Sequence, residues 1–168
     1  QMKIWYFQGP ATEIALQFFV KRPGAEAEEI FDLTKFNKSL QTASKSLNAA
    51  VTDEGIKIML PNKILFDIGK SVLKPEADQS INDLLVFLNM YPEATVQING
   101  HSDASGNDSD NLKLSEERAN AFLMKLKSKN IPEGLQIVTK GYGDTKPIAK
   151  NDTENGRMQN RRVEIIIK

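Results

Sequence analysis

The stretch INGHSDASGNDSDNLKLSEERA, residues 98–119, decides how the rest of the chain can be interpreted. It follows an alternating apolar segment, residues 94–98, whose composition predicts a β-strand. The strand leads into a polar loop that contains Asp103, so a carboxylate is expected at the end of a strand. Ser115 then precedes two glutamates at the start of a helical pattern, which predicts that Ser115 is the N-cap of the helix.

Arg118 follows this predicted cap by three positions, where a capping box would require Glu or Gln. A cation gains nothing from the N-terminal end of a helix, so we expect Arg118 to pair with a negative group elsewhere. Asp103 and Arg118 are therefore predicted to face each other across the corner between strand, loop and helix. From these residues alone, an internal salt bridge that only shapes the loop is the other interpretation of the pair.

A series of separated motifs resembles the signature of OmpA-like domains, the periplasmic modules of outer-membrane protein A, peptidoglycan-associated lipoproteins and flagellar stator proteins. The motifs share the family's order along the chain, and they are Gly100-His101-Ser102-Asp103, Asn111, Leu114-Ser115, Arg118-Ala119, Gly141-Tyr142-Gly143, Pro147-Ile148-Ala149, Gly156-Arg157 and Asn160-Arg161-Arg162-Val163-Glu164. Upstream, Ile64-Leu65-Phe66-Asp67 and Leu73-Lys74-Pro75-Glu76-Ala77 resemble the end of the family's first strand and its first helix. The resemblance covers residues 54–168.

The apolar patterns and the resemblance together predict an α+β fold, with one mixed four-stranded sheet packed by helices and a helix before it. The elements are expected in the order β-α-β-α-β-β, with strands near 55–60, 94–98, 135–138 and 163–167. Helices are expected near residues 75–90 and from Ser115 onward. The polar segment between Gly141 and Asn160 has little periodicity, and it is predicted to be a long functional loop.

Three regions are expected along the chain. Residues 1–27 combine strand-like segments with a linker, and residues 6–9 also resemble a protease-tag remnant. Residues 28–52 are predicted to form an amphipathic helix, and residues 53–168 the OmpA-like domain. Apolar residues of the helix follow each other by three and four positions: Leu33, Phe36, Leu40, Ala43, Leu47 and Ala50. Packing of this seam on the following domain is expected, and a homodimer through residues 33–50 is the alternative.

The composition excludes several classes of protein. Lys plus Arg and Asp plus Glu number 22 each, so there is no overall basic field to attract nucleic acid. The absence of cysteine excludes a disulfide scaffold and a cysteine metal site, and one histidine cannot build a His-rich site. No cofactor is expected. No apolar run is long enough for a membrane span and no signal peptide is visible, so the resemblance implies membrane contact only through an upstream anchor or barrel.

The resemblance also implies a ligand, the free amino-acid end of meso-diaminopimelate in the peptidoglycan stem peptide. Carried over by position, Asp103 would hold its ammonium group and Arg118 its carboxylate, while Arg161 matches a further ligand-contacting arginine. An acid and an arginine suit such a zwitterion, because a guanidinium holds a carboxylate through two hydrogen bonds. The residues expected to support the loop are His101, Asn111 and Ser115.

Other residues near these positions are open to more than one interpretation. Arg157 and Arg162 are either ligand contacts or structural ties to loop carbonyls. Gly69 and Asp110 depart from the family pattern, in which several relatives have an asparagine and an aromatic residue. The acids around Asp103 do not form a calcium-binding EF-hand, because the position that requires glutamate is occupied by another residue.

The resemblance implies a non-enzymatic module that anchors an outer-membrane or envelope protein to the cell wall, in the periplasm and associated with the outer membrane. Porins, lipoproteins and stators all carry such a module. One alternative is an enzyme of the cell wall, which would need a second carboxylate across a sugar-sized cleft that the sequence does not mark. The other is a structural module that oligomerises through the helical seam.

Overall fold

The computed structural model describes residues 33–168, and the predictions for residues 1–27 and for the start of the 28–52 helix lie outside the described residues. Residues Thr42–Lys168 form one compact unit that contains the whole sheet. The elements are α1 (Leu33–Leu47), β1 (Ala50–Thr52), β2 (Gly55–Pro61), α2 (Asn62–Leu65), α3 (Ala77–Met90), β3 (Thr95–His101), α4 (Asp108–Lys127), β4 (Gln136–Gly141), α5 (Glu154–Asn160) and β5 (Arg162–Ile167).

The sheet has five strands, in the order β1-β2-β5-β3-β4. β5 runs antiparallel to both of its neighbours, β2 and β3, whereas β3 pairs with β4 in parallel. This mixed sheet with its helices confirms the predicted α+β class. The predicted number of four strands is wrong by one, because β1 was not expected.

The additional strand results from a hairpin directly after the first helix. α1 ends at Leu47, and the next residue, Asn48, adopts a left-handed φ of 49°, a conformation that terminates many helices. The chain then reverses so that Thr52 pairs with Gly55 across β1 and β2. The prediction that the helix extends to residue 52 is therefore wrong. Residues 52–55 close the hairpin.

Two short helices also replace predicted irregular or extended segments. α2 lies where the end of a strand was predicted, and Phe66 after it forms an isolated bridge with Leu73. α5 lies inside the segment that was predicted to be a long loop. The side chain of Thr153 caps α5, because its hydroxyl accepts a hydrogen bond of 3.1 Å from the amide of Gly156.

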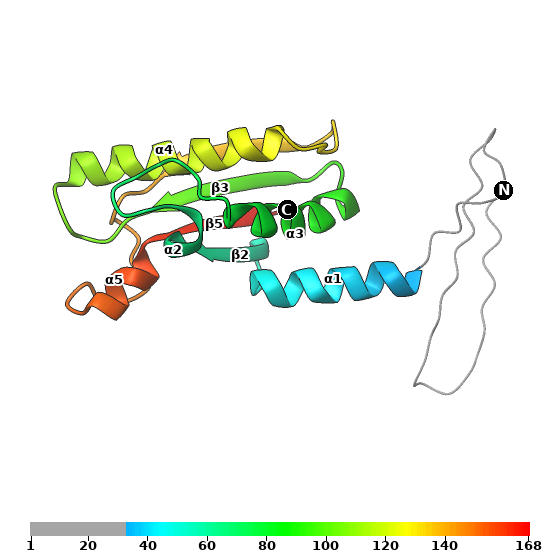
Figure 1. Cartoon of the computed structure of the whole chain (residues 1–168), viewed down its shortest axis with the longest axis horizontal. Coiled ribbons are helices and arrows are strands. Elements are labelled where there is room, and N and C mark those ends of the chain that lie inside the picture. Colours follow the sequence, from blue (N-terminus) through cyan, green and yellow to red (C-terminus); the bar gives the residue numbers. More distant parts are fainter. Residues whose placement is uncertain (1–32) are drawn as a thin grey trace. The chain divides into compact units, whose positions relative to one another are not determined.

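α3 and α4 cover the sheet with the apolar stripes that the sequence predicts, and Figure 1 shows both helices alongside β3 and β5. The two helices are neighbours, since Lys125 Nζ on α4 lies 3.0 Å from Asp78 Oδ1 on α3. The fully buried apolar residues of these two helices and of the sheet are Ala77, Ile81, Leu84 and Leu88 on α3, Ala119, Phe122 and Leu126 on α4, and Ile58, Val96, Ile98, Val163 and Ile165 on the sheet. Burial of each large side chain among them contributes about 1.5–3 kcal/mol.

α4 begins well before Ser115, so the prediction that Ser115 caps this helix is wrong. The N-cap is Asn107, whose Oδ1 accepts a hydrogen bond of 2.8 Å from the amide of Asp110. Ser115 lies inside the helix, where its hydroxyl donates to the carbonyl of Leu112 at 2.7 Å. The same hydroxyl accepts a hydrogen bond of 2.9 Å from the amide of Gly143, so Ser115 ties α4 to the loop after β4.

The backbone of α4 lies directly on the sheet at two glycines. A Cβ atom at Gly100 would clash with the carbonyl of Ser115, and one at Gly141 would lie 2.7 Å from the amide nitrogen of Glu116. Real Cβ atoms do not approach backbone atoms so closely, so only glycine allows this contact. The contact holds the part of α4 that carries Arg118 against the end of β3.

Gly100→Ala is expected to lower the free energy of unfolding by at least about 1–3 kcal/mol, the usual cost of overpacking. The clash is with backbone, which cannot rotate away as a flexible side chain can. Chemical denaturation followed by circular dichroism measures the change, with Val138→Ala on the exposed side of β4 as the control. An unchanged denaturation midpoint for Gly100→Ala would show that the close contact between α4 and β3 does not depend on the glycine.

The face of the sheet opposite to these helices carries buried polar side chains. Glu164 on β5 lies 2.7 Å from Arg162 Nη2 and 2.9 Å from Lys57 Nζ on β2. Burial raises the pKa of Glu164, but the hydrogen bonds from Lys57 and Arg162 outweigh this effect and hold the pKa below its usual value. The carboxylate is therefore compensated by two cations, and this cluster is complete without a ligand.

His101 on β3 lies beside this cluster and is 1% exposed. Its ring stacks on Tyr142 with the ring centroids 5.2 Å apart, and neither ring nitrogen hydrogen-bonds to another residue within the described part of the chain. The contact of His101 with the loop after β4 is therefore ring stacking on Tyr142. Burial, together with the nearby charge of Arg162, lowers the pKa of His101 to about 4.

Since the pKa of His101 is about 4 in the folded chain against 6.5 for an ordinary histidine, the unfolded chain binds more protons between these values. The free energy of unfolding is therefore expected to fall as the pH is lowered from 6.5 to 4. In this range the unfolded chain binds up to about one proton more than the folded chain. His101→Phe keeps a ring for stacking and should remove this part of the pH dependence. The contribution of Glu164, whose pKa is lowered below 4.5, is lost only at more acidic pH and should remain.

Urea denaturation of the wild type and of His101→Phe at several pH values between 4 and 8 gives the comparison. Two curves that run parallel between pH 6.5 and 4 would contradict the lowered pKa of His101.

Candidate functional site

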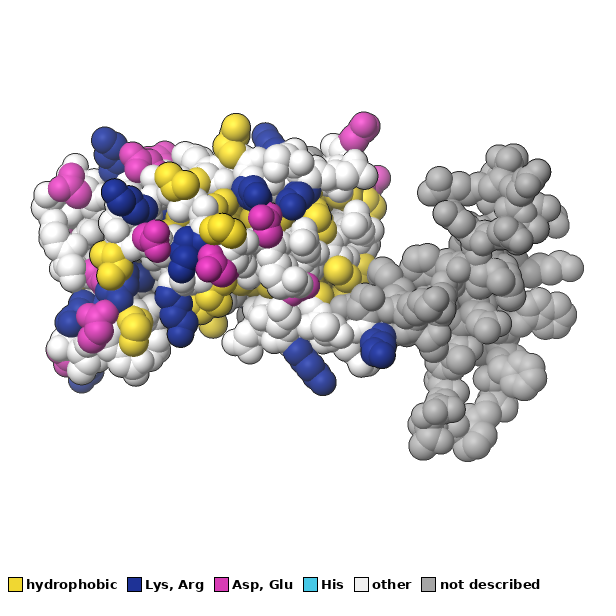
Figure 2. Space-filling view, viewed as in Figure 1, with side chains coloured by type: hydrophobic (Ala, Val, Ile, Leu, Met, Phe, Trp, Pro, Cys, Tyr) yellow, Lys and Arg dark blue, Asp and Glu magenta, His cyan; other side chains and the backbone are white. Residues whose placement is uncertain are grey.

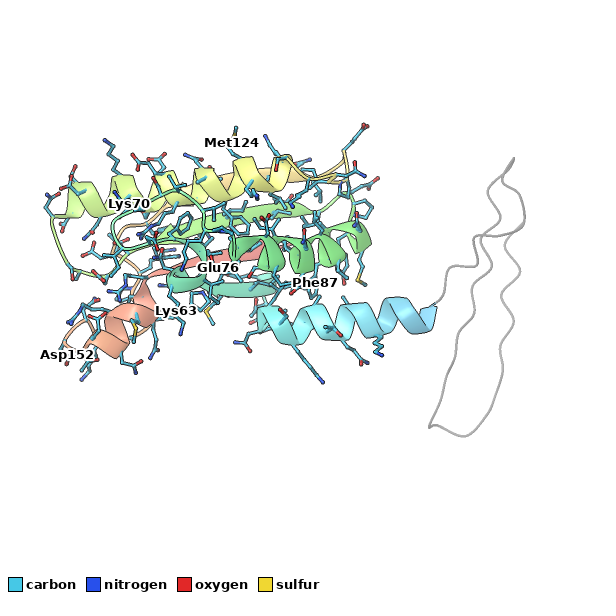
Figure 3. The ribbon with its side chains drawn as sticks, in the orientation of Figure 1. Lys63, Lys70, Glu76, Phe87, Met124 and Asp152 are labelled. Atoms are coloured by element: carbon cyan, nitrogen blue, oxygen red, sulfur yellow. The ribbon has the colours of Figure 1, made fainter. Side chains whose placement is uncertain are left out.

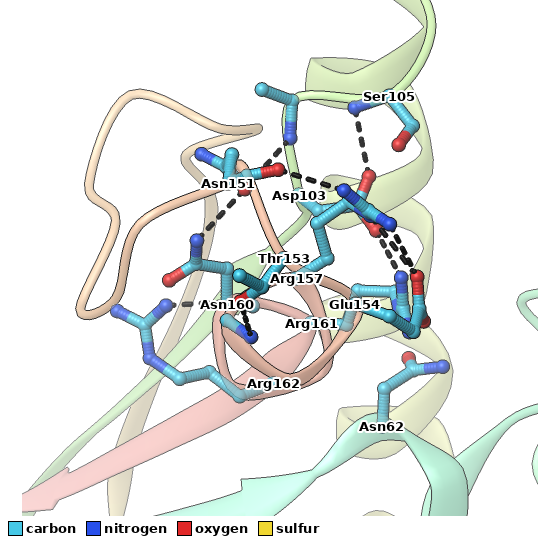
Figure 4. A network of polar contacts seen from close by, with 12 residues as sticks. Asn62, Asp103, Ser105, Asn151, Thr153, Glu154, Arg157, Asn160, Arg161 and Arg162 are labelled. Carbon is cyan, nitrogen blue, oxygen red and sulfur yellow. Dashed lines mark hydrogen bonds and ion pairs between the residues drawn. The ribbon is translucent and has the colours of Figure 1, made fainter.

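Asp103 stands in the loop that follows β3, as the sequence predicts. It is buried, and its Oδ1 accepts a hydrogen bond of 2.8 Å from the amide of Ser105. Its Oδ2 forms an ion pair with Arg161 Nη1 (Figure 4). Burial raises the pKa of Asp103, but the hydrogen bonds from Arg161 and Ser105 outweigh it, so the pKa lies below its usual value. The group is a carboxylate at neutral pH.

Arg161 reaches Asp103 because of the register of the sheet. His101 pairs with Arg162 across β3 and β5, so the residue before Arg162 lies next to the residues that follow His101. The backbone of Arg161 is held as well, since its carbonyl accepts a hydrogen bond of 2.9 Å from the amide of Asn62. The predicted third site residue thus lies in the same corner as Asp103.

Glu154 is a member of this network that sequence reasoning missed. It lies in the first turn of α5, and its Oε1 is 2.5 Å from Arg161 Nη2 (Figure 4). Its Oε2 is 2.9 Å from Arg157 Nη2. The hydrogen bonds from Arg161 and Arg157 lower the pKa of Glu154, although its side chain is 59% exposed. No sequence signal marked it, because α5 itself was not predicted.

Arg118 projects from α4 into a buried position, with 2% of the residue exposed. Its Nε donates a hydrogen bond of 3.0 Å to the carbonyl of Lys70, a residue that Figure 3 shows on the loop beside α4. The guanidinium carbon lies 5.4 Å from the centroid of the Phe66 ring. Burial, together with the nearby positive charge of Arg161, lowers the pKa of Arg118 to about 10, so the side chain is still charged at neutral pH.

Asp103 and Arg118 do not form the internal salt bridge that was the other interpretation of this pair, because the ion-pair partner of Asp103 is Arg161. The three charges nevertheless act on one another. The negative charge of Asp103 raises the pKa of Arg118, and the positive charge of Arg161 lowers it. The structure therefore brings all three predicted ligand-binding residues into one region, and no carboxylate within residues 33–168 forms an ion pair with Arg118.

The two remaining arginines act as structural ties, which was one of their two predicted interpretations. Arg162 donates to the carbonyls of Asn160 and Lys146 at 3.1 Å each, and Arg157 donates to the carbonyl of Asn151 at 2.8 Å. Asn160 performs a similar task in Figure 4, where its amide group donates to Asn151 Oδ1 at 2.8 Å. These contacts hold the loop between β4 and α5 beside the site.

The other predicted residues of the site have structural positions. Asn111 is buried in the early part of α4, with its amide nitrogen donating to no other residue in the part of the chain that the structure describes. Gly69 has a left-handed φ of 69° on an exposed loop, and Asp110 accepts a hydrogen bond of 2.6 Å from the Asn107 side chain. Neither of these two family departures lies in the Asp103–Arg161 contact.

Within residues 33–168, histidine and acidic side chains form no cluster that could hold a metal ion. Over the same residues, no helix has the length and apolar character that crossing a membrane requires.

Comparison with known proteins supports this fold and identifies its family. The OmpA family model matches residues 65–161. The probable lipoprotein YiaD of Escherichia coli is 33% identical over 130 residues, which make up 76% of this chain and 59% of that protein. The peptidoglycan-associated lipoprotein of Buchnera aphidicola is 31% identical over 130 residues, 77% of this chain and 75% of that protein.

Among solved structures, the cell wall anchor of the T6SS from Pseudomonas aeruginosa is similar with a TM-score of 0.63 and 26% sequence identity, over 77% of this chain and 94% of that one. The chain spans 14%, 59% and 31% of three curated relatives that it matches, so those proteins are longer than the part they share with it. The family model covers more than half of the chain, and the chain covers three quarters of the Buchnera lipoprotein. The chain therefore belongs to the OmpA family.

Proposed function

We propose that this site binds peptidoglycan non-covalently, through the diaminopimelate of the stem peptide, and thereby anchors an envelope protein to the cell wall. The observation that carries the proposal is the state of Arg118. This arginine is charged and buried, and within residues 33–168 its hydrogen-bond partner is the neutral carbonyl of Lys70, not a carboxylate. A buried charge without an opposite charge is costly, and the carboxylate of a ligand would remove that cost.

The neighbouring acid supplies the other half of a site for a zwitterion. Among residues 33–168, Ser105 donates to one oxygen of Asp103 and Arg161 donates to the other. An ionised carboxylate offers about four lone-pair sites, so Asp103 can also accept a hydrogen bond from a ligand ammonium group. The free end of diaminopimelate carries an ammonium and a carboxylate on one carbon, which fits an acid beside an arginine.

The names of two similar proteins support this proposal. The Buchnera relative is a peptidoglycan-associated lipoprotein, and the Pseudomonas structure is a cell wall anchor. Each of the two matches covers 77% of this chain. We infer the same class of ligand here, and a location in the periplasm in association with the outer membrane.

The acids of the site favour binding over hydrolysis. The runner-up function, a cell-wall enzyme, needs a second carboxylate near Asp103, and Glu154 does lie on the other side of Arg161. A general acid of a glycosidase requires a raised pKa, however. The pKa values of both Asp103 and Glu154 are lowered, so neither group carries a proton to donate at neutral pH. We therefore propose a module without catalytic activity.

The surface gives no support for a nucleic-acid partner. Figure 2 shows basic and acidic side chains interspersed over the visible face of the described residues, in agreement with equal numbers of each in the sequence. A homodimer through residues 33–50 stays a prediction. The last turns of that seam are buried within the Thr42–Lys168 unit, at Ala43 and Leu47.

The chain is expected to sediment with insoluble peptidoglycan sacculi of the diaminopimelate type and to release no soluble muropeptides. Arg118→Ala should leave most of the protein in the supernatant, because it removes the unpaired buried cation. Lys113→Ala removes an exposed cation from the same helix and is the matched control, expected to pellet like the wild type. A wild-type chain that stays wholly in solution, or that solubilises the sacculi, would count against the proposal.

The site should also distinguish diaminopimelate from lysine at the third position of the stem peptide. Lysine offers an ammonium to Asp103 but lacks the second carboxylate, so Arg118 would stay unpaired. A hydrogen bond to a charged group contributes about 1.5–3 kcal/mol, which corresponds to a preference of about ten- to hundredfold. Arg118→Ala should lose most of this preference, whereas Asp103→Ala should weaken both peptides.

Calorimetric titration of the two stem peptides into the three proteins gives the comparison, with melting curves as the control for folding. If Arg118→Ala keeps the full preference for diaminopimelate, another residue holds the carboxylate and this assignment is wrong.

A further inference from the structure

Arg161 is shared between two carboxylates with different surroundings. Asp103 on one side is buried, with 8% of its side chain exposed, and the loop after β3 fixes it. Glu154 on the other side is 59% exposed and lies on the first turn of a short helix. Both terminal nitrogens of the Arg161 guanidinium are therefore occupied within the protein itself, one by each acid (Figure 4).

The contact with Glu154 uses donors that a ligand would also need. A guanidinium is a planar fork with a limited set of N–H groups, and it binds a carboxylate best through two of them. Asp103 takes Nη1, and Glu154 takes Nη2, so a ligand carboxylate cannot reach the Nη2 side of Arg161 without meeting Glu154. Glu154 thus stands where an incoming carboxylate would be placed.

Glu154 also has a second partner to which it can remain attached. Its Oε2 accepts from Arg157 Nε at 3.0 Å and lies 2.9 Å from Arg157 Nη2, on the same turn of α5. When Glu154 leaves Arg161, this pair within the helix is kept. The remaining charges, Arg118, Arg161 and Asp103, then sum to one positive charge, which suits a ligand that brings one more carboxylate than it brings ammonium groups.

We propose that Glu154 is a tethered carboxylate that competes with the ligand carboxylate for Arg161, an inference that rests on the proposed function of the site. Because Glu154 occupies Arg161, simple anions do not bind there. A ligand displaces Glu154 only when it also offers an ammonium to Asp103 and a carboxylate to Arg118. Glu154 is therefore a specificity-determining residue, and it lowers the affinity for the ligand.

The test is calorimetric titration of the full chain with the tripeptide L-alanyl-γ-D-glutamyl-meso-diaminopimelate. Glu154→Gln keeps the size of the side chain but removes its charge, and it should bind the tripeptide about two- to fivefold more tightly, since exposed ion pairs are weak. Asp152→Asn removes the same charge from an exposed position two residues away that is outside the network, and it should leave the affinity unchanged. Melting curves confirm that each variant is folded.

A second ligand shows whether carboxylates compete. The free-end carboxylate is assigned to Arg118, so the carboxylate that competes with Glu154 for Arg161 is the other carboxylate of diaminopimelate. In an analogue of the tripeptide in which that other carboxylate is a carboxamide, the gain from Glu154→Gln should largely disappear. An equal gain with the amide, or an equal gain from Asp152→Asn, would overturn the competition in favour of a general charge effect. Weaker binding by Glu154→Gln would also overturn it and would make Glu154 a residue that positions Arg161.

The result separates this inference from the proposed function. If neither the wild type nor Glu154→Gln binds the tripeptide, the proposed function fails and the competition fails with it. If the wild type binds and Glu154→Gln binds no more tightly, only the competition is overturned.

Discussion

The direct contact between the backbone of α4 and the ends of β3 and β4 is the constraint on which the site depends. Gly100 and Gly141 allow the helix to lie on the strands without intervening side chains, and Ser115 fastens it there through the amide of Gly143. A side chain at either glycine would lift the helix. Arg118 lies one turn beyond Ser115, so the height of the helix determines how near Arg118 comes to the loop after β3.

The central position of β5 supplies the other half of the geometry. This strand lies between β2 and β3, antiparallel to both, so its N-terminal end meets the C-terminal end of β3. Arg161 directly precedes β5 and Asp103 closely follows β3, and the antiparallel register therefore places them together. Residues far apart in the sequence become neighbours through strand order alone, before any interaction between their side chains is considered.

The sequence predicted the parts of the fold that follow from periodicity. The apolar stripes of α3 and α4 are buried as expected, because burial of large side chains dominates the stability of such elements. It did not predict the start of α4, since both Asn107 and Ser115 are good caps and local chemistry does not choose between them. The ion pair of Asp103 with Arg161, and the role of Glu154, depend on strand order and on a short helix, which no local pattern encodes.

The two charged clusters of the domain differ in how completely their charges are paired within the protein. This difference indicates that one cluster is structural and that the other binds a ligand. On the outer face of the sheet, Glu164 is buried between Lys57 and Arg162, and its charge is matched within the protein. On the helix side, Arg118 is equally buried, but its hydrogen-bond partner within residues 33–168 is the carbonyl of Lys70. A fold gains nothing from keeping such a charge unmatched. The cost of burying the charge of Arg118 is offset when a ligand brings a carboxylate. Of the two carboxylates that hold Arg161, the exposed Glu154 is the one that a ligand can displace.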